Sequence, residues 1–178
     1  MTINHFEVLR AGINTTFQDK GRNNLYHIGI PFSGAMDQRN YLLANKLVGN
    51  ESGSAVIEFA LQGPLLKYHG SQINVAISGD VNFELKKGNE KFQGNCYESY
   101  ILDDNDEINI LSTNKSVYGY LSINGIFDIK YQWGSCSVNT KANIGSNSGK
   151  KIKDLQKINI KNIHNNFTKK KIGFYKHQ

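Results

Sequence analysis

The chain has 178 residues, of which 39% are hydrophobic, so it can bury the core of one domain and is not disordered throughout. No apolar run reaches the roughly 18 to 20 residues of a membrane span, and the start MTINHFEVLRAG lacks a secretory signal, so we expect a cytoplasmic protein without a membrane partner. The net charge is +6, and residues from 145 onward hold nine lysines and one acid, so residues 1–144 have a balance of −2. No motif for specific nucleic-acid binding accompanies this basic end.

A helix is predicted over residues 37–48, the first clear element along the chain. Asp37 is a suitable N-cap, because its carboxylate can accept the free N–H groups of a first turn. Gly49 provides a C-terminal stop. One apolar stripe at helical spacing is formed by Leu43, Ala44, Leu47 and Val48.

Most of the remaining chain is predicted to form short strands separated by Gly, Asn and Asp. Alternating β-branched and aromatic residues predict strands at 73–78, 81–85, 99–102, 108–111, 117–123 and 152–160. Gly88 and Asn89 predict the tip of a hairpin. Within 117–123, Tyr118 and Tyr120 fall on the face opposite to Leu121 and Ile123. The fold class is therefore all-β in the main, as a barrel or a sandwich.

Candidate functional residues gather in the first 40 positions. The segment 29–37, GIPFSGAMD, leads into the predicted helix, where backbone N–H groups can bind an anion. Alternatively, Ser33 and Asp37 simply cap that helix. Glu58 lies in an apolar run and is either exposed at an edge or buried for a function. Asp80 follows a strand, where turn chemistry is the commoner explanation.

Several common motifs are absent from the sequence. The run GSNSGKK at 145–151 lacks the spacing of a phosphate-binding loop and is interpreted as an ordinary loop. Cys96 and Cys136 lie far apart without metal-ligand spacing, so we expect two reduced thiols and no metal site.

A set of short blocks resembles the allophanate hydrolase subunit 2 or KipA-like family, also called the biotin-dependent carboxyltransferase domain family. This family includes the C subunit of 5-oxoprolinase and the carboxyltransferase part of urea carboxylase. The blocks are TTFQDKGR (15–22), GIPFSGAMD (29–37), LANKLVGN (43–50), AVIEF (55–59), AISGD (76–80), YLSING (120–125), GSCS (134–137) and GKKIKDL (149–155).

The resemblance implies a cyclophilin-like β-barrel with one prominent helix near 37–48. It covers residues 1–160 as the N-terminal half of a carboxyltransferase domain and leaves 161–178 as a poorly ordered, Lys-rich tail. It further implies a subunit of an ATP-dependent 5-oxoprolinase, which opens a lactam to glutamate, or of a related carboxyltransferase complex. ATP is the implied cofactor, and biotin would arrive only on a partner. The implied partners are a KipI-like (allophanate hydrolase subunit 1) protein and a LamB/YcsF-like protein, or a second copy of the chain. The alternative is a non-catalytic, KipA-like regulatory or partner-binding module.

The same resemblance marks the candidate site residues. It implies catalytic roles for Asp19, Arg22 and Asp37, with Arg22 pairing with a carboxylate or phosphate. The implied substrate-binding residues are Gln18, Ser33, Gly34, Met36, Glu58, Ser78, Asp80 and Ser135. The chain departs from the family in three places: it is about half as long, Cys136 stands where the family usually has Arg, and Asn124-Gly125-Ile126 stands where a Gly-Gly pair is expected.

Overall fold

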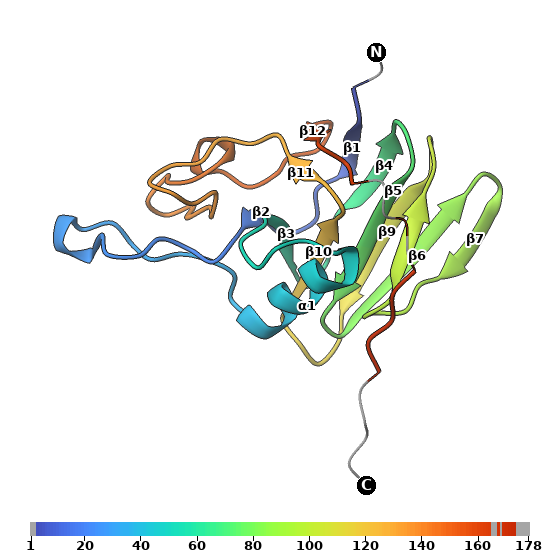
Figure 1. Cartoon of the computed structure of the whole chain (residues 1–178), viewed down its shortest axis with the longest axis horizontal. Helices are drawn as coiled ribbons and strands as arrows, with labels where there is room; N and C mark the ends of the chain where they lie inside the picture. The colour runs from blue at the N-terminus through green and yellow to red at the C-terminus, as the bar shows by residue number, and fades with distance from the viewer. Residues whose placement is uncertain (1–2, 165–166, 168, 174–178) are drawn as a thin grey trace, which may run out of the picture.

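The fold consists of two antiparallel sheets and one α-helix (Figure 1). The computed structural model describes residues 3–164, 167 and 169–173. The larger sheet has the order β11 (Ile126–Phe127), β12 (Lys157–Lys161), β1 (His5–Arg10), β4 (Leu65–His69), β9 (Glu107–Thr113), β6 (Val81–Lys87) and β7 (Glu90–Gln93). The smaller sheet has the order β2 (Asn14–Gln18), β3 (Val56–Ala60), β10 (Tyr118–Ile123), β5 (Ile73–Ser78) and β8 (Ser99–Leu102). The all-β expectation is confirmed.

One apolar core lies between the two sheets. Alternate residues of most strands point into it, as the two-residue period of a strand requires, whereas all four residues of β7 are exposed. The larger sheet contributes Phe6 and Phe83, for example, and the smaller one contributes Phe17, Phe59 and Leu121, all of which are buried. The opposite, outward face of the smaller sheet is left for the helix and for the candidate site.

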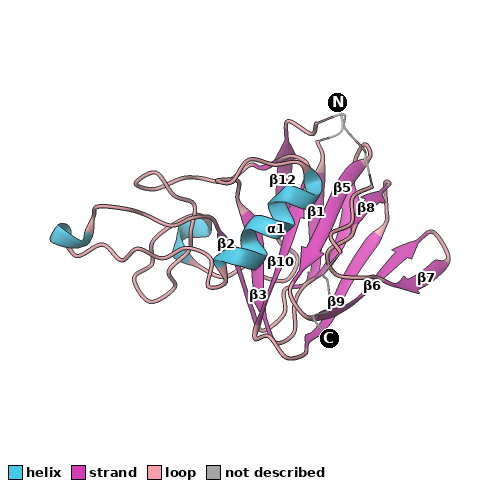
Figure 2. Cartoon of the chain, turned by 60° about the horizontal axis from the view of Figure 1, so that its bottom comes forward, coloured by secondary structure: helices cyan, strands magenta, loops and turns pink. Residues whose placement is uncertain are grey.

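Helix α1 (Gln38–Val48) covers part of this outward face, against β5 and β10 (Figure 2). Asp37 caps it by accepting the N–H of Asn40, as predicted, and Gly49 ends it with a φ of 81°. Ser33 does not cap the helix, because its hydroxyl has no partner among the described residues. The buried stripe also includes Tyr41 and Asn45, whereas the predicted Leu43 is only half-buried.

The strand predictions are confirmed for β5 and β8 at their exact bounds, and for β6, β9 and β10 within three residues. The hairpin at Gly88 joins β6 to β7 as expected. The predicted strand at 152–160 begins only at Lys157, because Ile152 instead hydrogen-bonds along the free edge of β2. The strands β1, β2 and β4 and the short β11 were not predicted. Strand β2 contributes only one residue, Phe17, to the apolar core, so its sequence shows little apolar alternation.

Part of the expected Lys-rich tail runs beside the edge strand β8. The N–H of Ile172 donates to Tyr97, the N–H of Ser99 donates to Lys170, and Lys171 forms an ion pair with Glu98. The expectation for residues 165–166, 168 and 174–178 lies outside the described residues.

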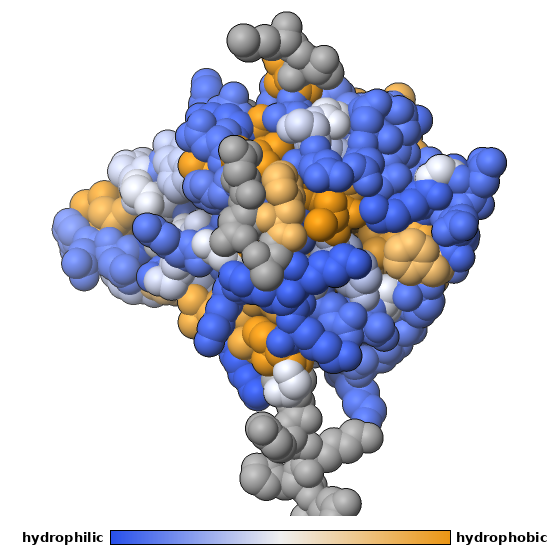
Figure 3. Space-filling model, turned by 45° about the vertical axis from the view of Figure 1, so that its right-hand side comes forward, coloured by the Kyte–Doolittle hydropathy of each residue, from blue (hydrophilic) through white to orange (hydrophobic). Residues whose placement is uncertain are grey.

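On the face shown in Figure 3, apolar residues form scattered patches among hydrophilic ones. Within the part of the chain that the structure describes, no helix is long and apolar enough to cross a membrane.

Two long segments project together from one side of the sheets, at the left of Figure 1. The first is 19–35, with the short 3-10 helix η1 (Tyr26–Ile28), and the second is 128–150, with η2 (Asn147–Gly149). We call the two segments together the side lobe. Residues of both segments line the candidate site where the lobe meets the sheets.

Candidate functional site

The floor of the candidate site is the outward face of β2, β3 and β10. Thr16, Glu58 and Tyr120 occupy one row across these strands, because Glu58 is paired with Thr16 on one side and with Tyr120 on the other. Their neighbours Phe17 and Ile57 point the opposite way, into the core. Strand alternation therefore places a row of polar groups on the outward face of the smaller sheet, opposite the apolar residues on its core face.

A pocket of about 420 Å³ lies over this floor. The loop before α1 forms one wall, and the start of the 138–141 turn forms the other. Its lining consists of Asn14, Thr16, Gln18, Ser33, Gly34, Met36, Glu58, Tyr118, Val138, Asn139, Thr140 and Lys141. The pocket brings together five of the eleven predicted site residues, namely Gln18, Ser33, Gly34, Met36 and Glu58.

Glu58 is the buried carboxyl group of this pocket, with only 4% of its surface exposed. Its Oε2 accepts the N–H of Met36 at 2.7 Å, and the hydroxyl of Tyr120 donates to the same carboxyl group. Burial raises the pKa of Glu58, although these two hydrogen bonds act in the opposite direction. Of the positions left open by the sequence, exposure at an edge is wrong, because Glu58 is buried.

Gln18 has one amide atom that is satisfied and one that is not. Its Nε2 donates to the hydroxyl of Thr16 at 2.9 Å and to the carbonyl of Val138 at 3.0 Å. Its Oε1 is buried without a donor among the described residues. The buried hydroxyl of Ser33 likewise has no partner there, and Ser33 adopts a φ of 57°, which is uncommon for a residue with a side chain.

Asp19 lies at the start of the side lobe and does not line the pocket. Its carboxylate accepts hydrogen bonds from the hydroxyls of Ser135 and Ser137 and from the N–H groups of Gly21 and Cys136. Burial alone would raise the pKa of Asp19, but these four hydrogen bonds together hold the pKa below its ordinary value. The structure therefore gives Asp19 and Ser135 a common role, which is to join the two segments of the lobe.

Arg22 joins the same segments from the other direction. It is 2% exposed, its Nε donates to the carbonyl of Gln132, and its Nη2 donates to the carbonyls of Ser135 and Ser137. These contacts differ from the expected pairing with a substrate anion: the guanidinium binds loop carbonyls inside the protein. Cys136 is also inside, with its side chain in the core between the sheets.

The remaining predicted site residues lie elsewhere. Asp37 is the N-cap of α1, and the hydroxyl of Ser78 donates to the carbonyl of Asn40 in the same helix. Asp80 is exposed at a separate turn, where it accepts from the side chain of Asn114 and the N–H of Lys115. Asp80 therefore has the turn role that the sequence favoured.

Sequence reasoning missed Thr16, Tyr118 and Tyr120 as parts of the site, together with the 138–141 turn. The alternation of Tyr118 and Tyr120 against apolar residues was visible in the sequence and indicates their shared face. The turn could not be found in this way, because it meets β2 through a backbone hydrogen bond from Val138 to Phe17.

Three N–H groups at the start of helix α1 have acceptors within the protein. That of Met36 donates to Glu58, that of Asp37 donates to the Tyr120 hydroxyl, and that of Asn40 donates to Asp37. Among the described residues there is no group of three or more His, Cys, Asp or Glu that could hold a metal ion. The side chains that line the pocket can form hydrogen bonds, and Glu58 can exchange a proton.

These features define a mainly β domain with a ligand-sized pocket on the outer face of one sheet. Residues 28–177 match the family described as carboxyltransferase domain, subdomain A and B, so the chain belongs to that family. It is 34% identical over 154 residues to a urea amidolyase of Lachancea kluyveri, covering 83% of this chain and 8% of that protein. It is 28% identical over 167 residues to the C subunit of 5-oxoprolinase from Escherichia coli, covering 86% of this chain and 48% of that protein.

The fold agrees with that of a relative of known structure. The crystal structure of the K. lactis urea amidolyase superimposes with a TM-score of 0.83 and 33% sequence identity, covering 90% of this chain and 10% of that one. The chain thus spans about half of the Escherichia coli relative and a small part of the two urea amidolyases.

Proposed function

We propose that this chain belongs to a complex that acts on small amides, either by ATP-dependent opening of 5-oxoproline or by a related carboxyltransferase reaction. The observation that carries the proposal is the pocket over β2, β3 and β10. It combines an amide oxygen on Gln18 and a hydroxyl on Ser33, both without a partner among the described residues, with a buried carboxyl group on Glu58. The relatives named as a 5-oxoprolinase component and as urea amidolyase support the reaction class.

A lactam carbonyl is a poor electrophile, so its opening requires activation and accurate orientation. In the overall reaction water adds to the carbonyl carbon, the carbon–nitrogen bond of the ring breaks, and glutamate forms while ATP is hydrolysed to ADP and phosphate. This chain would orient the amide by hydrogen bonds, which lowers the entropic part of the barrier. Glu58, whose pKa is raised by burial, would be available to exchange a proton with the bound amide. Three N–H groups at the start of α1 donate to groups of the protein itself, and no step involving ATP is assigned to these residues.

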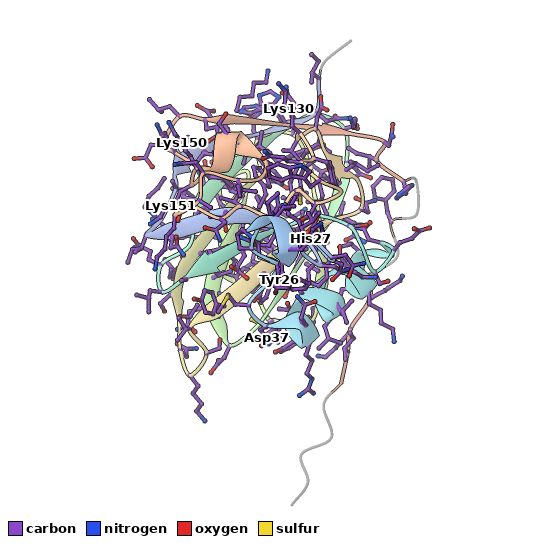
Figure 4. The ribbon with its side chains drawn as sticks, turned by 90° about the vertical axis from the view of Figure 1, so that its left-hand side faces the viewer. Tyr26, His27, Asp37, Lys130, Lys150 and Lys151 are labelled. Carbon is purple, nitrogen blue, oxygen red and sulfur yellow. The ribbon has the colours of Figure 1, made fainter. Side chains whose placement is uncertain are left out.

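In this proposal the partners are a KipI-like and a LamB/YcsF-like protein, and any biotin is carried by a partner. The side lobe is where we place the contact with them. Its two segments carry Tyr26, Ile28, Tyr131 and Trp133, all at least 49% exposed. Figure 4 looks onto this side of the molecule, where Tyr26 and His27 lie toward the viewer and Lys130, Lys150 and Lys151 lie above them. Exposed aromatic residues are enriched in protein interfaces.

The same lobe favours a second candidate function, a partner-binding module without chemistry of its own. A projecting lobe fixed by Asp19 and Arg22 can bind a partner whether or not the pocket is used. The two functions differ in one respect, because only the first requires the pocket residues.

The test is 5-oxoproline-dependent ATP hydrolysis by the chain co-expressed with its KipI-like and LamB/YcsF-like partners. The proposal predicts turnover that requires this chain and that falls when Glu58→Gln is introduced. Tyr26→Ala serves as the matched lobe variant and should reduce assembly of the complex. A soluble complex that shows no turnover, or turnover indifferent to Glu58→Gln, would leave the partner-binding module as the function.

A further inference from the structure

The orientation of the Gln18 amide is determined by its surroundings. A carbonyl oxygen only accepts hydrogen bonds, so the group facing the Val138 carbonyl must be the amide nitrogen. The oxygen of the same amide is then directed away from this contact, where the described residues supply no donor. Gln18 is 5% exposed, so water replaces the missing donor poorly. A buried acceptor in this state is destabilising until a donor reaches it.

The hydroxyl of Ser33 provides the complementary group. Ser33 lies in the loop before α1, which forms a wall of the same pocket, and its buried hydroxyl has no partner among the described residues. A hydroxyl can donate to a carbonyl oxygen, whereas the Gln18 oxygen can only accept. The pocket therefore offers an acceptor from β2 and a donor from the loop before α1, which match the N–H and C=O of an amide.

We propose that Gln18 is the specificity-determining residue of the pocket: its Oε1 accepts the N–H of an amide ligand, while the Ser33 hydroxyl donates to the carbonyl oxygen of that ligand. This inference rests on the proposed function, because it names the residue that selects the amide in the same pocket. The strained backbone of Ser33, held between Phe32 and Gly34, keeps its hydroxyl in this wall. Lys141 at the rim supplies a positive charge for a ligand that also carries a carboxylate.

Such a pocket must reject a ligand in which an oxygen atom replaces the N–H group. In that case the Gln18 oxygen would face a second lone pair, and a site built to hydrogen-bond an N–H group discriminates strongly against analogues that lack it. We expect a difference in affinity of about tenfold or more.

The experiment measures binding of two ring compounds to the full chain by calorimetry. One is 5-oxoproline, and the other is the corresponding lactone, 5-oxotetrahydrofuran-2-carboxylate, in which a ring oxygen replaces the N–H group. The wild-type chain should bind the lactam at least about tenfold more tightly. Gln18→Ala should abolish the difference, whereas Gln93→Ala, a glutamine on the exposed edge strand β7, should preserve it.

Equal binding of the two compounds by the wild-type chain, no binding of either, or a preference that survives Gln18→Ala would overturn the inference. The wild-type comparison needs no variant, so it remains decisive even where Gln18→Ala does not fold. The outcome is also distinct from that of the turnover assay. Lactam preference without turnover would remove the proposed function alone, and turnover without lactam preference would remove this inference alone.

Discussion

Replacing Asp19 by asparagine removes the charge on which the side lobe depends. Oδ1 of Asp19 accepts from the hydroxyls of Ser135 at 2.5 Å and Ser137 at 2.6 Å and from the N–H of Gly21 at 2.8 Å. Oδ2 accepts from the N–H of Cys136 at 2.7 Å. An asparagine that keeps Oδ1 in place turns its NH2 group toward Cys136, so donor then faces donor.

The cost follows from these four contacts. Leaving the buried N–H of Cys136 unsatisfied costs about 1–3 kcal/mol, and the other three hydrogen bonds lose their charged acceptor, which weakens each of them. Relief from burying a charge offsets part of this loss. We expect Asp19→Asn to lower the free energy of unfolding by about 3 kcal/mol and Asp19→Ala, which strands all four donors, by about 4–5 kcal/mol.

Urea unfolding of the wild type and the variants at pH 7 measures these differences. The matched control is Asp80→Asn, since Asp80 also accepts two hydrogen bonds but is exposed, and it should change stability little. Because the pKa of folded Asp19 lies below its ordinary value of 3.8, the wild type should lose this contribution as the pH falls through the folded pKa. Asp19→Asn should lack that loss. Equal effects of Asp19→Asn and Asp80→Asn would refute the reasoning.

Three further predictions concern the pocket and the core. Burial raises the pKa of Glu58 above its ordinary 4.5, so its contribution to stability is present below pH 4.5 and is lost as the pH rises through the folded pKa. Glu58→Gln should therefore gain in stability relative to the wild type between pH 4 and 8, as measured by urea titrations. A stability difference that stays constant with pH would contradict this. At Gly34, which has a φ of 95°, a methyl group would lie 3.0 Å from the carbonyl oxygen of Lys20. Gly34→Ala should therefore lower the free energy of unfolding by about 1–3 kcal/mol, and with it the thermal unfolding midpoint. Gly53→Ala, where a methyl group meets open space, should lower neither. Cys136 is fully buried and burial raises the pKa of its thiol, so it should react with a thiol reagent only at the rate of unfolding; rapid reaction in the native protein would show that the lobe opens.

The sequence was most informative where local patterns and burial agree. The helix carries its cap at Asp37 and its stop at Gly49, so both ends could be predicted within one residue. Strands β5 and β8 are rich in residues that favour strands and lie beside turns, and their bounds were predicted correctly. Strand β2, NTTFQ, could not be predicted, because Phe17 is the single residue that it contributes to the apolar core.

The resemblance marks candidate residues, but it does not predict the contacts that they make. Gln18, Asp19 and Arg22 lie within five positions, yet only Gln18 lines the pocket, while Asp19 and Arg22 bind a loop more than 100 residues later in the chain. No local pattern reports a contact at that separation. Glu58 shows the same limitation, since its burial depends on Met36 and Tyr120, which reach it from other elements.

The most direct test of the central claim, that the pocket over β2, β3 and β10 is the ligand site, is a titration of the 15N-labelled chain with 5-oxoproline followed by NMR. We predict that the largest shifts fall on the side-chain NH2 of Gln18, the backbone N–H of Met36 and the turn 138–141. Asp80 and its turn should not move. Shifts that centre on that turn, or the absence of any shift at millimolar ligand, would contradict the assignment of this pocket.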